Sequence, residues 1–457
     1  MSEQILKKDT NPITTGVIWK QILIFFFPIL IGAFFQQLYN TFDAAVVGKF
    51  AGKEALASVG GSSGQILNFI FSFFMGLSTG ATVIIAQHYG AKEDRKVDDA
   101  LHTAYTFALV GGILLGIIGI IVARPFLLLL KTPSNLLDSS TTYVCILMGG
   151  LVLTLIYNIG SGILRAIGDS KRPLYILMVC CSVNVVLDLI FVWALHLGVL
   201  GAAIATDISQ GISALLITWL LMKKTVGMRL SFHKLHMNPR MLGRILKIGL
   251  PTAIAGSMFS VSNMIVQSTL NSRGVDVIAA WTAYGRIDGL WWMINQAFSV
   301  SITTFVGQNF GAGKWNRIKK ATGEVLAMEI VTAIFLGGLV LLNAPTLLQI
   351  FTQDQHVIDI GITMSRDIAP FYWVFAISEI LGATLRAENY VMVSTITNIL
   401  GICIYRIIWV KFLVPRASVP TILYCYPISW SICSIIILIY FIYRQRRIRS
   451  AYHLPSE

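Results

Sequence analysis

The segment "NVVLDLIF", residues 184–191, places an amide and a carboxylate in an otherwise apolar run. Asn184 and Asp188 are four residues apart, so on a helix both side chains point from the same face. An ionised carboxylate inside a membrane is costly unless a partner neutralises it. A bound proton can do this, and so can a hard cation such as Na⁺ held by oxygen ligands. The pair therefore indicates a site for H⁺ or Na⁺, or else a carboxyl group that its neighbours satisfy permanently.

The overall composition is that of a membrane protein. Of the 457 residues, 55% are apolar and 12% are charged, whereas a soluble domain carries about 25% charged residues. Stretches of about 20 mostly apolar residues, enough to cross a hydrocarbon core of about 30 Å, recur along the whole sequence. We therefore expect an all-α polytopic membrane protein. Its twelve expected transmembrane helices are 18–47, 55–86, 101–123, 137–163, 173–195, 199–222, 244–270, 277–308, 321–345, 357–385, 390–413 and 419–443.

The start of the chain and its cysteines indicate neither a cleaved signal nor a metal site. The polar stretch before residue 17 is short, and the apolar segment after it is too long for a signal peptide. The six cysteines lie in or near apolar segments without metal-ligand spacing, so we expect buried thiols and no disulfide. There is no HExxH zinc motif and no phosphate-binding P-loop. We expect no enzymatic activity, no cofactor and no direct coupling to ATP.

The net charge of +13 is distributed unevenly among the loops. By our count, 24 Lys and Arg lie in or beside the termini and the loops after spans 2, 4, 6, 8 and 10, and 7 lie in or beside the other loops. Positive residues remain on the cytoplasmic side, so both termini are expected to be cytoplasmic, in a prokaryotic inner membrane. The basic segment "RQRRIR" (444–449) then favours anionic membrane lipid as its partner, and no nucleic acid.

The two halves of the chain repeat each other. "AQHYGA" (86–91) and "GQNFGA" (307–312) are 221 residues apart, and Pro28 and Pro251 are 223 apart. Six spans per half make the two halves parallel repeats, an arrangement that suits alternating access. The expected domains are an amino-terminal six-helix bundle (1–222), a cytoplasmic linker (223–243), a carboxyl-terminal six-helix bundle (244–443) and a basic cytoplasmic tail (444–457).

Several motifs together resemble multidrug and toxic compound extrusion (MATE) transporters. They are "QQLYNTFDAAVVGKFAG" (36–52), "AQHYGA" (86–91), "LRAIGDSKRP" (164–173), "NVVLDLIF" (184–191), "LGVLGAAIAT" (197–206) and "PISW" (427–430). The resemblance implies a V-shaped twelve-helix antiporter that exports organic cations and similar amphiphiles in exchange for H⁺ or Na⁺. One motif departs from the pattern, because "LRAENY" (385–390) in the second half lacks the "GD" that follows "LRA" in the first.

The resemblance also implies an ion-coupling site in the first half. Carried over residue by residue, this site consists of Asp43, Asn184, Asp188 and Thr206. Depth along the expected helices, at 1.5 Å per residue, places all four in the outer half of the membrane. The repeat positions of Asp43, Asn184 and Asp188 are Val266, Tyr405 and Trp409, so the second half has no equivalent cluster. Any bound metal would be Na⁺ at this one site.

Aromatic, amide and carboxylate side chains within the spans are candidates for a substrate cavity. An aromatic face and a carboxylate attract a lipophilic cation, and methionine adapts to varied shapes. The candidates are Gln36, Gln37, Tyr39, Asn40, Asn68, Met75, Trp281, Asp288, Trp291 and Glu379. For the intramembrane charges of the second half, pairing within the bundle is the main alternative to substrate contact. The expected partners are small amphiphilic or cationic molecules and membrane lipids, and the chain is expected to be a monomer.

A second function from the same superfamily is a flippase or exporter of a lipid-linked or other endogenous metabolite. Binding a pyrophosphate would require many cationic side chains in the cavity. The expected spans contain only Lys20, Arg286, Arg366 and Arg406. The carboxylates in the first half therefore favour the ion-coupled antiporter.

Overall fold

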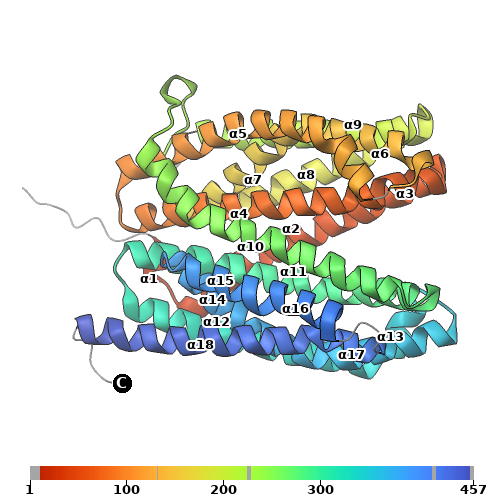
Figure 1. Cartoon of the computed structure of the whole chain (residues 1–457). Coiled ribbons are helices and arrows are strands. Elements are labelled where there is room, and N and C mark those ends of the chain that lie inside the picture. The colour runs from red at the N-terminus through yellow and green to blue at the C-terminus, as the bar shows by residue number, and fades with distance from the viewer. Residues whose placement is uncertain (1–10, 131, 224–227, 414–417, 453–457) are drawn as a thin grey trace, which may run out of the picture. The chain divides into compact units, whose positions relative to one another are not determined.

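The computed structural model describes residues 11–130, 132–223, 228–413 and 418–452, and helices dominate these ranges (Figure 1). Residues 1–10, 224–227 and 453–457 lie outside the described residues. The expectations for the extreme amino terminus, the middle of the linker and the end of the basic tail therefore concern segments beyond this description.

The described chain forms two compact units. The amino-terminal unit comprises residues 28–260, and the carboxyl-terminal unit comprises residues 11–27 and 261–452 of the described chain. The chain changes unit inside two long helices, α2 (Ile18–Val46) and α10 (Pro239–Asn271). This grouping differs from a division at residues 222 and 244, because the first part of α2 and the first part of α10 each belong to the unit of the other half of the sequence.

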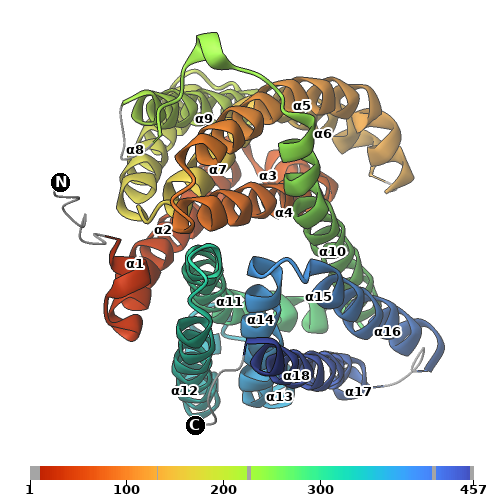
Figure 2. The same cartoon turned by 90° about the vertical axis from the view of Figure 1, so that its left-hand side faces the viewer.

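The amino-terminal unit is a helical bundle around α7 and α9 (Figure 2). Helix α7 packs against α4, α5 and α9, and α9 also packs against α6 and α8. Besides the parts of α2 and α10, its helices are α3 (Lys53–Gly60), α4 (Ser62–Gly90), α5 (Asp94–Leu129), α6 (Ser134–Gly149), α7 (Leu151–Ala166), α8 (Lys171–Asp188) and α9 (Gly198–Met222). Two π-helical segments, Val47–Ala51 and Leu189–Ala194, follow α2 and α8, and the 3-10 turn Phe232–Lys234 precedes α10.

Small residues allow close packing in this bundle. A Cβ atom at Gly112 of α5 would lie 2.7 Å from the Cα of Val152 in α7. A Cβ atom at Gly116 would lie 2.6 Å from the carbonyl oxygen of Met148 in α6. In lipid the helices gain little from hydrophobic burial against each other, so such close backbone approach is a main source of helix association.

The carboxyl-terminal unit is built around α14, which packs against α11, α12 and α18. The π-helical segments Ile399–Ile404 and Trp409–Leu413 continue α15 and α16, and the 3-10 turn Ala369–Phe371 joins α13 to α14. Besides the parts of α2 and α10, its helices are α1 (Pro12–Thr15), α11 (Val275–Gly311), α12 (Trp315–Gln349), α13 (Gln355–Ile368), α14 (Tyr372–Ala387), α15 (Val391–Asn398), α16 (Tyr405–Ile408), α17 (Val419–Leu423) and α18 (Cys425–Tyr452).

Every expected span falls on a helix or on consecutive helical segments, which confirms the all-α polytopic fold class. Ten helical segments are long and apolar enough to cross a membrane, and the pair α6 and α7, bent by 48°, would be an eleventh. The remaining expected span, 277–308, lies in α11, which is 37 residues long and carries Asp276, Arg286 and Asp288. These charges lower its hydropathy, although its length is more than sufficient to span a bilayer.

The basic tail begins as a continuation of α18, which runs to Tyr452. Arg444, the first residue of "RQRRIR", is buried and forms an ion pair with Glu388 just after α14. Its guanidinium is therefore a link between α14 and α18, and it is not available to lipid headgroups as the sequence suggested.

Candidate functional site

The four residues expected to couple ion flux lie together in the amino-terminal unit. Asp43 comes from α2, Asn184 and Asp188 from α8, and Thr206 from α9. Asn184 and Asp188 are fully buried, and Asp43 is 8% exposed. Tyr39, one helical turn before Asp43, lies with its hydroxyl 3.2 Å from the Thr206 hydroxyl and so connects α2 to α9.

The carboxyl groups of Asp43 and Asp188 lie within hydrogen-bonding range of each other. Two carboxyl groups can share a hydrogen bond only when one of them carries a proton. The Oδ1 atom of each is buried and receives no hydrogen bond from the protein. Because a buried acceptor without a donor is costly, these two oxygens mark a place for a bound proton or cation.

Asn184 fixes the position of Asp188. With its amide oriented to satisfy both ends, Asn184 donates from Nδ2 to Oδ2 of Asp188 at 2.9 Å and accepts the backbone N–H of Thr206 at 3.3 Å. The amide thus bonds α8 to α9 and leaves only the second carboxylate oxygen of Asp188 open. The spacing of four residues that the sequence showed is what places both side chains on one helix face.

Local backbone irregularities border this site on both helices. The π-helical segment Leu189–Ala194 begins directly after Asp188, and Val47–Ala51 begins four residues after Asp43. Such π-helical turns are rare in proteins and are frequent at functional sites. The chain then turns into α9 through Gly198, whose φ of +55° is costly for residues with a Cβ atom.

Two further residues belong to this neighbourhood and were not singled out from the sequence. Tyr143 of α6 is 6% exposed, and it lies close enough to Asp43, Asp188 and Asp207 to interact electrostatically with all three. Asp207 directly follows Thr206 on α9 and is half-buried. A carboxylate inside an apolar span was the available signal for Asp207, whereas nothing local in the sequence points to Tyr143.

The other substrate-cavity candidates of the first half do not form an enclosed pocket within this unit. Tyr39 is half-buried and belongs to the ion-coupling cluster. The remaining five are exposed on the surface of the unit: Gln36, Gln37, Asn40, Asn68 and Met75.

In the carboxyl-terminal unit, Asp288 and Trp281 line a cavity of about 140 Å³. The Asp288 carboxylate accepts hydrogen bonds from the Tyr372 hydroxyl at 2.6 Å, the Trp292 Nε1 at 2.7 Å and the Tyr284 hydroxyl at 3.2 Å. Three donors and no basic group at hydrogen-bond distance favour the ionised carboxylate. The other lining residues are Asn263, Gln267, Trp292, Ile368, Tyr426 and Trp430.

Trp291 and Arg406 support this cavity from behind. Trp291 is fully buried and stacks on Tyr372 at 5.0 Å between ring centroids, so it holds one of the donors to Asp288 and does not line the cavity. Arg406 lies over the Tyr426 ring at 4.2 Å and donates to Oδ1 of Asn263 at 3.0 Å.

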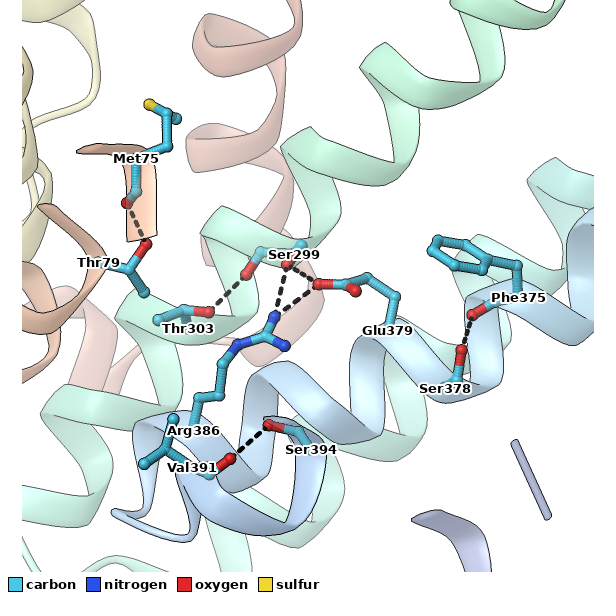
Figure 3. A network of polar contacts seen from close by, with 10 residues as sticks. All are labelled: Met75, Thr79, Ser299, Thr303, Phe375, Ser378, Glu379, Arg386, Val391 and Ser394. Atoms are coloured by element: carbon cyan, nitrogen blue, oxygen red, sulfur yellow. Dashed lines mark hydrogen bonds and ion pairs between the residues drawn. The ribbon is translucent and has the colours of Figure 1, made fainter. Parts of the chain in front are cut away.

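Glu379 has a different environment, shown in Figure 3. Its carboxylate pairs with Arg386 at 2.6 Å and accepts a hydrogen bond from the Ser299 hydroxyl at 2.6 Å. Arg386 comes from the departing motif "LRAENY", and Glu379 does not line the Asp288 cavity. The contacts therefore favour pairing within the bundle for Glu379.

Two repeated helical bundles, a buried carboxyl pair in one and a carboxylate in an aromatic cavity in the other define a multi-pass membrane transporter and not an enzyme. Comparison with known proteins makes this specific. Residues 28–190 and 251–410 both match the MatE family, and their starting points are 223 residues apart, as the sequence repeat predicted. The chain therefore belongs to the MatE family.

Individual relatives agree with this assignment. The probable multidrug resistance protein YoeA of Bacillus subtilis (strain 168) is 27% identical over 398 residues, which cover 84% of each chain. The probable multidrug resistance protein YpnP of the same organism is 27% identical over 401 residues, covering 86% of this chain and 88% of that protein. A solved structure of a MOP superfamily transporter from Pyrococcus furiosus has a TM-score of 0.89 at 21% identity and covers 96% of this chain and 99% of its own. That last likeness concerns the fold.

Proposed function

We propose that this protein is a secondary antiporter that exports organic cations or amphiphilic drugs in exchange for protons by alternating access. It acts in the inner membrane of a prokaryote with both termini in the cytoplasm. The observation that carries the proposal is the buried contact between Asp43 and Asp188, whose Oδ1 atoms receive no protein hydrogen bond. The names of the relatives YoeA and YpnP, probable multidrug resistance proteins, support drugs as the exported molecules.

The donors around the pair favour H⁺ over Na⁺ as the coupling ion. Asn184 turns its NH₂ group towards Asp188, and its oxygen already accepts the N–H of Thr206. A sodium ion needs several oxygen ligands around it, whereas a proton needs only the two facing carboxyl groups. Na⁺ is the second candidate, because the two open oxygens could also contribute to its coordination.

Exchange follows from the charge of the pair. With one proton bound, the Asp43 and Asp188 carboxyl groups carry one negative charge, and without it they carry two. Two buried charges at such short range are unfavourable. The deprotonated site therefore favours a conformation in which water reaches it, and protonation favours a closed site. Drug and proton then drive the transporter because each has a different affinity for the two access states.

The cavity at Asp288 suits one cationic or aromatic group of a substrate. Its volume of about 140 Å³ is near that of engineered cavities that hold a single benzene ring. The faces of Trp281 and Tyr426 together with the Asp288 carboxylate attract a cation. In the amino-terminal unit, exposed amides such as Gln37 and Asn40 favour an aqueous surface, because hydrocarbon would leave them without hydrogen-bond partners.

The test is uptake of a fluorescent organic cation into inside-out vesicles, driven in separate experiments by a proton gradient and by a sodium gradient. We expect accumulation with an acidic vesicle interior and none with sodium alone. The matched control is Asp188→Asn, which should accumulate no dye under either gradient. Accumulation driven by sodium alone would replace the coupling ion, and inertness of the wild type under both gradients would favour the lipid-linked metabolite flippase.

A further inference from the structure

Asp207 is a carboxylate in the membrane-spanning region that no ion pair explains. It lies nine residues into α9 and is half-buried. Among the described residues it has neither a hydrogen-bond donor nor a basic partner. Structural carboxylates inside a membrane are almost always paired, so an unpaired one indicates a role in transport.

The position of the Asp207 side chain depends on a glycine. A Cβ atom at Gly150 would lie 2.1 Å from its Oδ1 and 2.5 Å from its Oδ2, so only glycine leaves room for the carboxyl group there. Gly150 lies between α6 and α7, at the bend of 48°. The bend and the glycine thus bring the carboxyl group against the backbone of the helix that carries Tyr143.

Tyr143 connects Asp207 with the carboxyl pair. Its phenol interacts electrostatically with Asp207 on one side and with Asp43 and Asp188 on the other. A phenol hydroxyl accepts one hydrogen bond and donates another, so it can pass a proton along a chain. Tyr143 is the titratable neighbour from α6, and no Lys, Arg or His contributes to the electrostatics of Asp207.

The exposures of these carboxyl groups explain why the pair needs such a connection. Asp188 is fully buried and Asp43 is 8% exposed, whereas Asp207 is half-buried and can meet solvent. A proton from water reaches Asp207 more readily than it reaches the pair.

We propose that Asp207 is a proton relay that connects solvent with the Asp43 and Asp188 pair through Tyr143. In the inward transfer, the protonated Asp207 gives its proton to the Tyr143 oxygen while the Tyr143 hydroxyl gives its own to the deprotonated pair. Asp207 is left as a carboxylate, the pair gains one proton, and Tyr143 is unchanged. The relay rests on the proposed function, since it serves the same ion-coupling pair. It makes Asp207 a determinant of the exchange rate and not of the ion stoichiometry.

The test compares Asp207→Asn, Asp207→Glu and Tyr143→Phe with wild type in proteoliposomes. The measurements are the rate of proton-driven drug exchange in H₂O and D₂O, the protons released per drug bound, and equilibrium drug affinity. We expect Asp207→Asn and Tyr143→Phe to slow exchange by on the order of 10²-fold, the low end for loss of a proton-transfer group. Stoichiometry and drug affinity should remain at wild-type values, the solvent isotope effect should rise, and Asp207→Glu should recover most of the rate. The control is Asp138→Asn, an exposed carboxylate of α6 that pairs with Arg124 and should exchange normally.

Other outcomes overturn the relay. A wild-type rate in Asp207→Asn excludes it, and a loss of drug affinity at an unchanged rate makes Asp207 a substrate contact. A changed proton stoichiometry makes Asp207 a member of the binding site itself. Asp188→Asn in the same series separates this proposal from the proposed function: if that variant still exchanges protons, the coupling site is wrong, and if it is inert while Asp207→Asn is normal, only the relay fails.

Discussion

Single side chains explain why a carboxylate can lie in an apolar helix. Asp188 is held by Asn184 on one oxygen and faces Asp43. Its other oxygen receives no protein hydrogen bond. A purely structural carboxylate would have donors at both oxygens, because each unsatisfied buried acceptor is destabilising. The partial satisfaction is what a reversible proton site requires.

Replacing Asp188 with Asn tests this requirement directly. The substitution nearly keeps the volume and removes the negative charge, so the protein should fold, since a neutral amide costs less to bury than an unpaired carboxylate. Drug binding should persist, but proton-driven exchange should disappear, because proton binding can no longer bias the two states. Asp43→Asn should behave in the same way, whereas Asn184→Ala and Thr206→Ala should weaken coupling. The measurements are drug accumulation in vesicles and equilibrium drug binding on the purified variants. Wild-type accumulation by Asp188→Asn would leave this carboxyl group with a structural role only.

Asp288 should affect substrate preference rather than ion dependence. Asp288→Asn removes the charge in the aromatic cavity, and a cation–aromatic site of this kind is worth about 0.5–2 kcal/mol. We expect the affinity for monovalent organic cations to fall about 2- to 30-fold, while neutral substrates and the dependence on the proton gradient are unaffected. Equilibrium binding of a cationic and a neutral dye to the same preparation checks this. An equal loss for both dyes would indicate a packing defect, and a lost proton dependence would place coupling in the wrong unit.

The helices themselves were largely predictable, and their partners were not. Long apolar runs must become helices in a membrane, because only that structure satisfies the backbone internally. Asn184 and Asp188 could be paired from their spacing alone. Tyr143 and Asp207 could not, because their contacts with the site depend on how α6 and α9 pack. The exchange of the first parts of α2 and α10 between units likewise depends on tertiary packing that no local pattern records.

The close approach of α5 to its neighbours should be sensitive to a single methyl group. Gly116→Ala would place a Cβ atom 2.6 Å from the backbone oxygen of Met148, which cannot move without shifting α6. We expect a loss of about 1–3 kcal/mol, typical of overpacking, seen as a lower midpoint of thermal unfolding in detergent. The control is Gly111→Ala, whose Cβ atom would be 3.7 Å from the Phe107 ring, so helix propensity should make it neutral or stabilising. Equal behaviour of the two variants would contradict close packing at this crossing.

The ion pair that links α14 to α18 should make stability depend on pH. Burial raises the pKa of the Glu388 carboxyl, which lies between two membrane spans, from 4.5 to about 7, and the Arg444 guanidinium offsets part of this rise. Because the folded protein holds this proton more tightly than the unfolded chain, the contribution of Glu388 to stability is full below pH 4.5 and is lost as pH rises to about 7.

Comparison with Glu388→Gln isolates this contribution. The thermal midpoint of the wild type relative to the variant should fall between about pH 5 and pH 7 and then stay constant. Thermal unfolding in detergent across this range measures it, with the exposed Glu54→Gln as a control whose difference from wild type should not follow this trend. A midpoint difference that rises with pH would mean that the pair with Arg444 outweighs the cost of burial.

The whole molecule has one orientation in the membrane if the charge asymmetry decides it. The count of 24 against 7 Lys and Arg in the two sets of loops predicts that both termini and the segment 228–238 face the cytoplasm. Short epitope tags at the two ends and beside Phe232 should then be accessible in inside-out vesicles and hidden in right-side-out ones. A tag beside His196, in the turn between α8 and α9, should show the opposite accessibility, because it follows an odd-numbered span. An amino terminus and a carboxyl terminus on opposite sides would leave an odd number of spans. That result would show that α11, the most highly charged of the expected spans, does not cross the membrane.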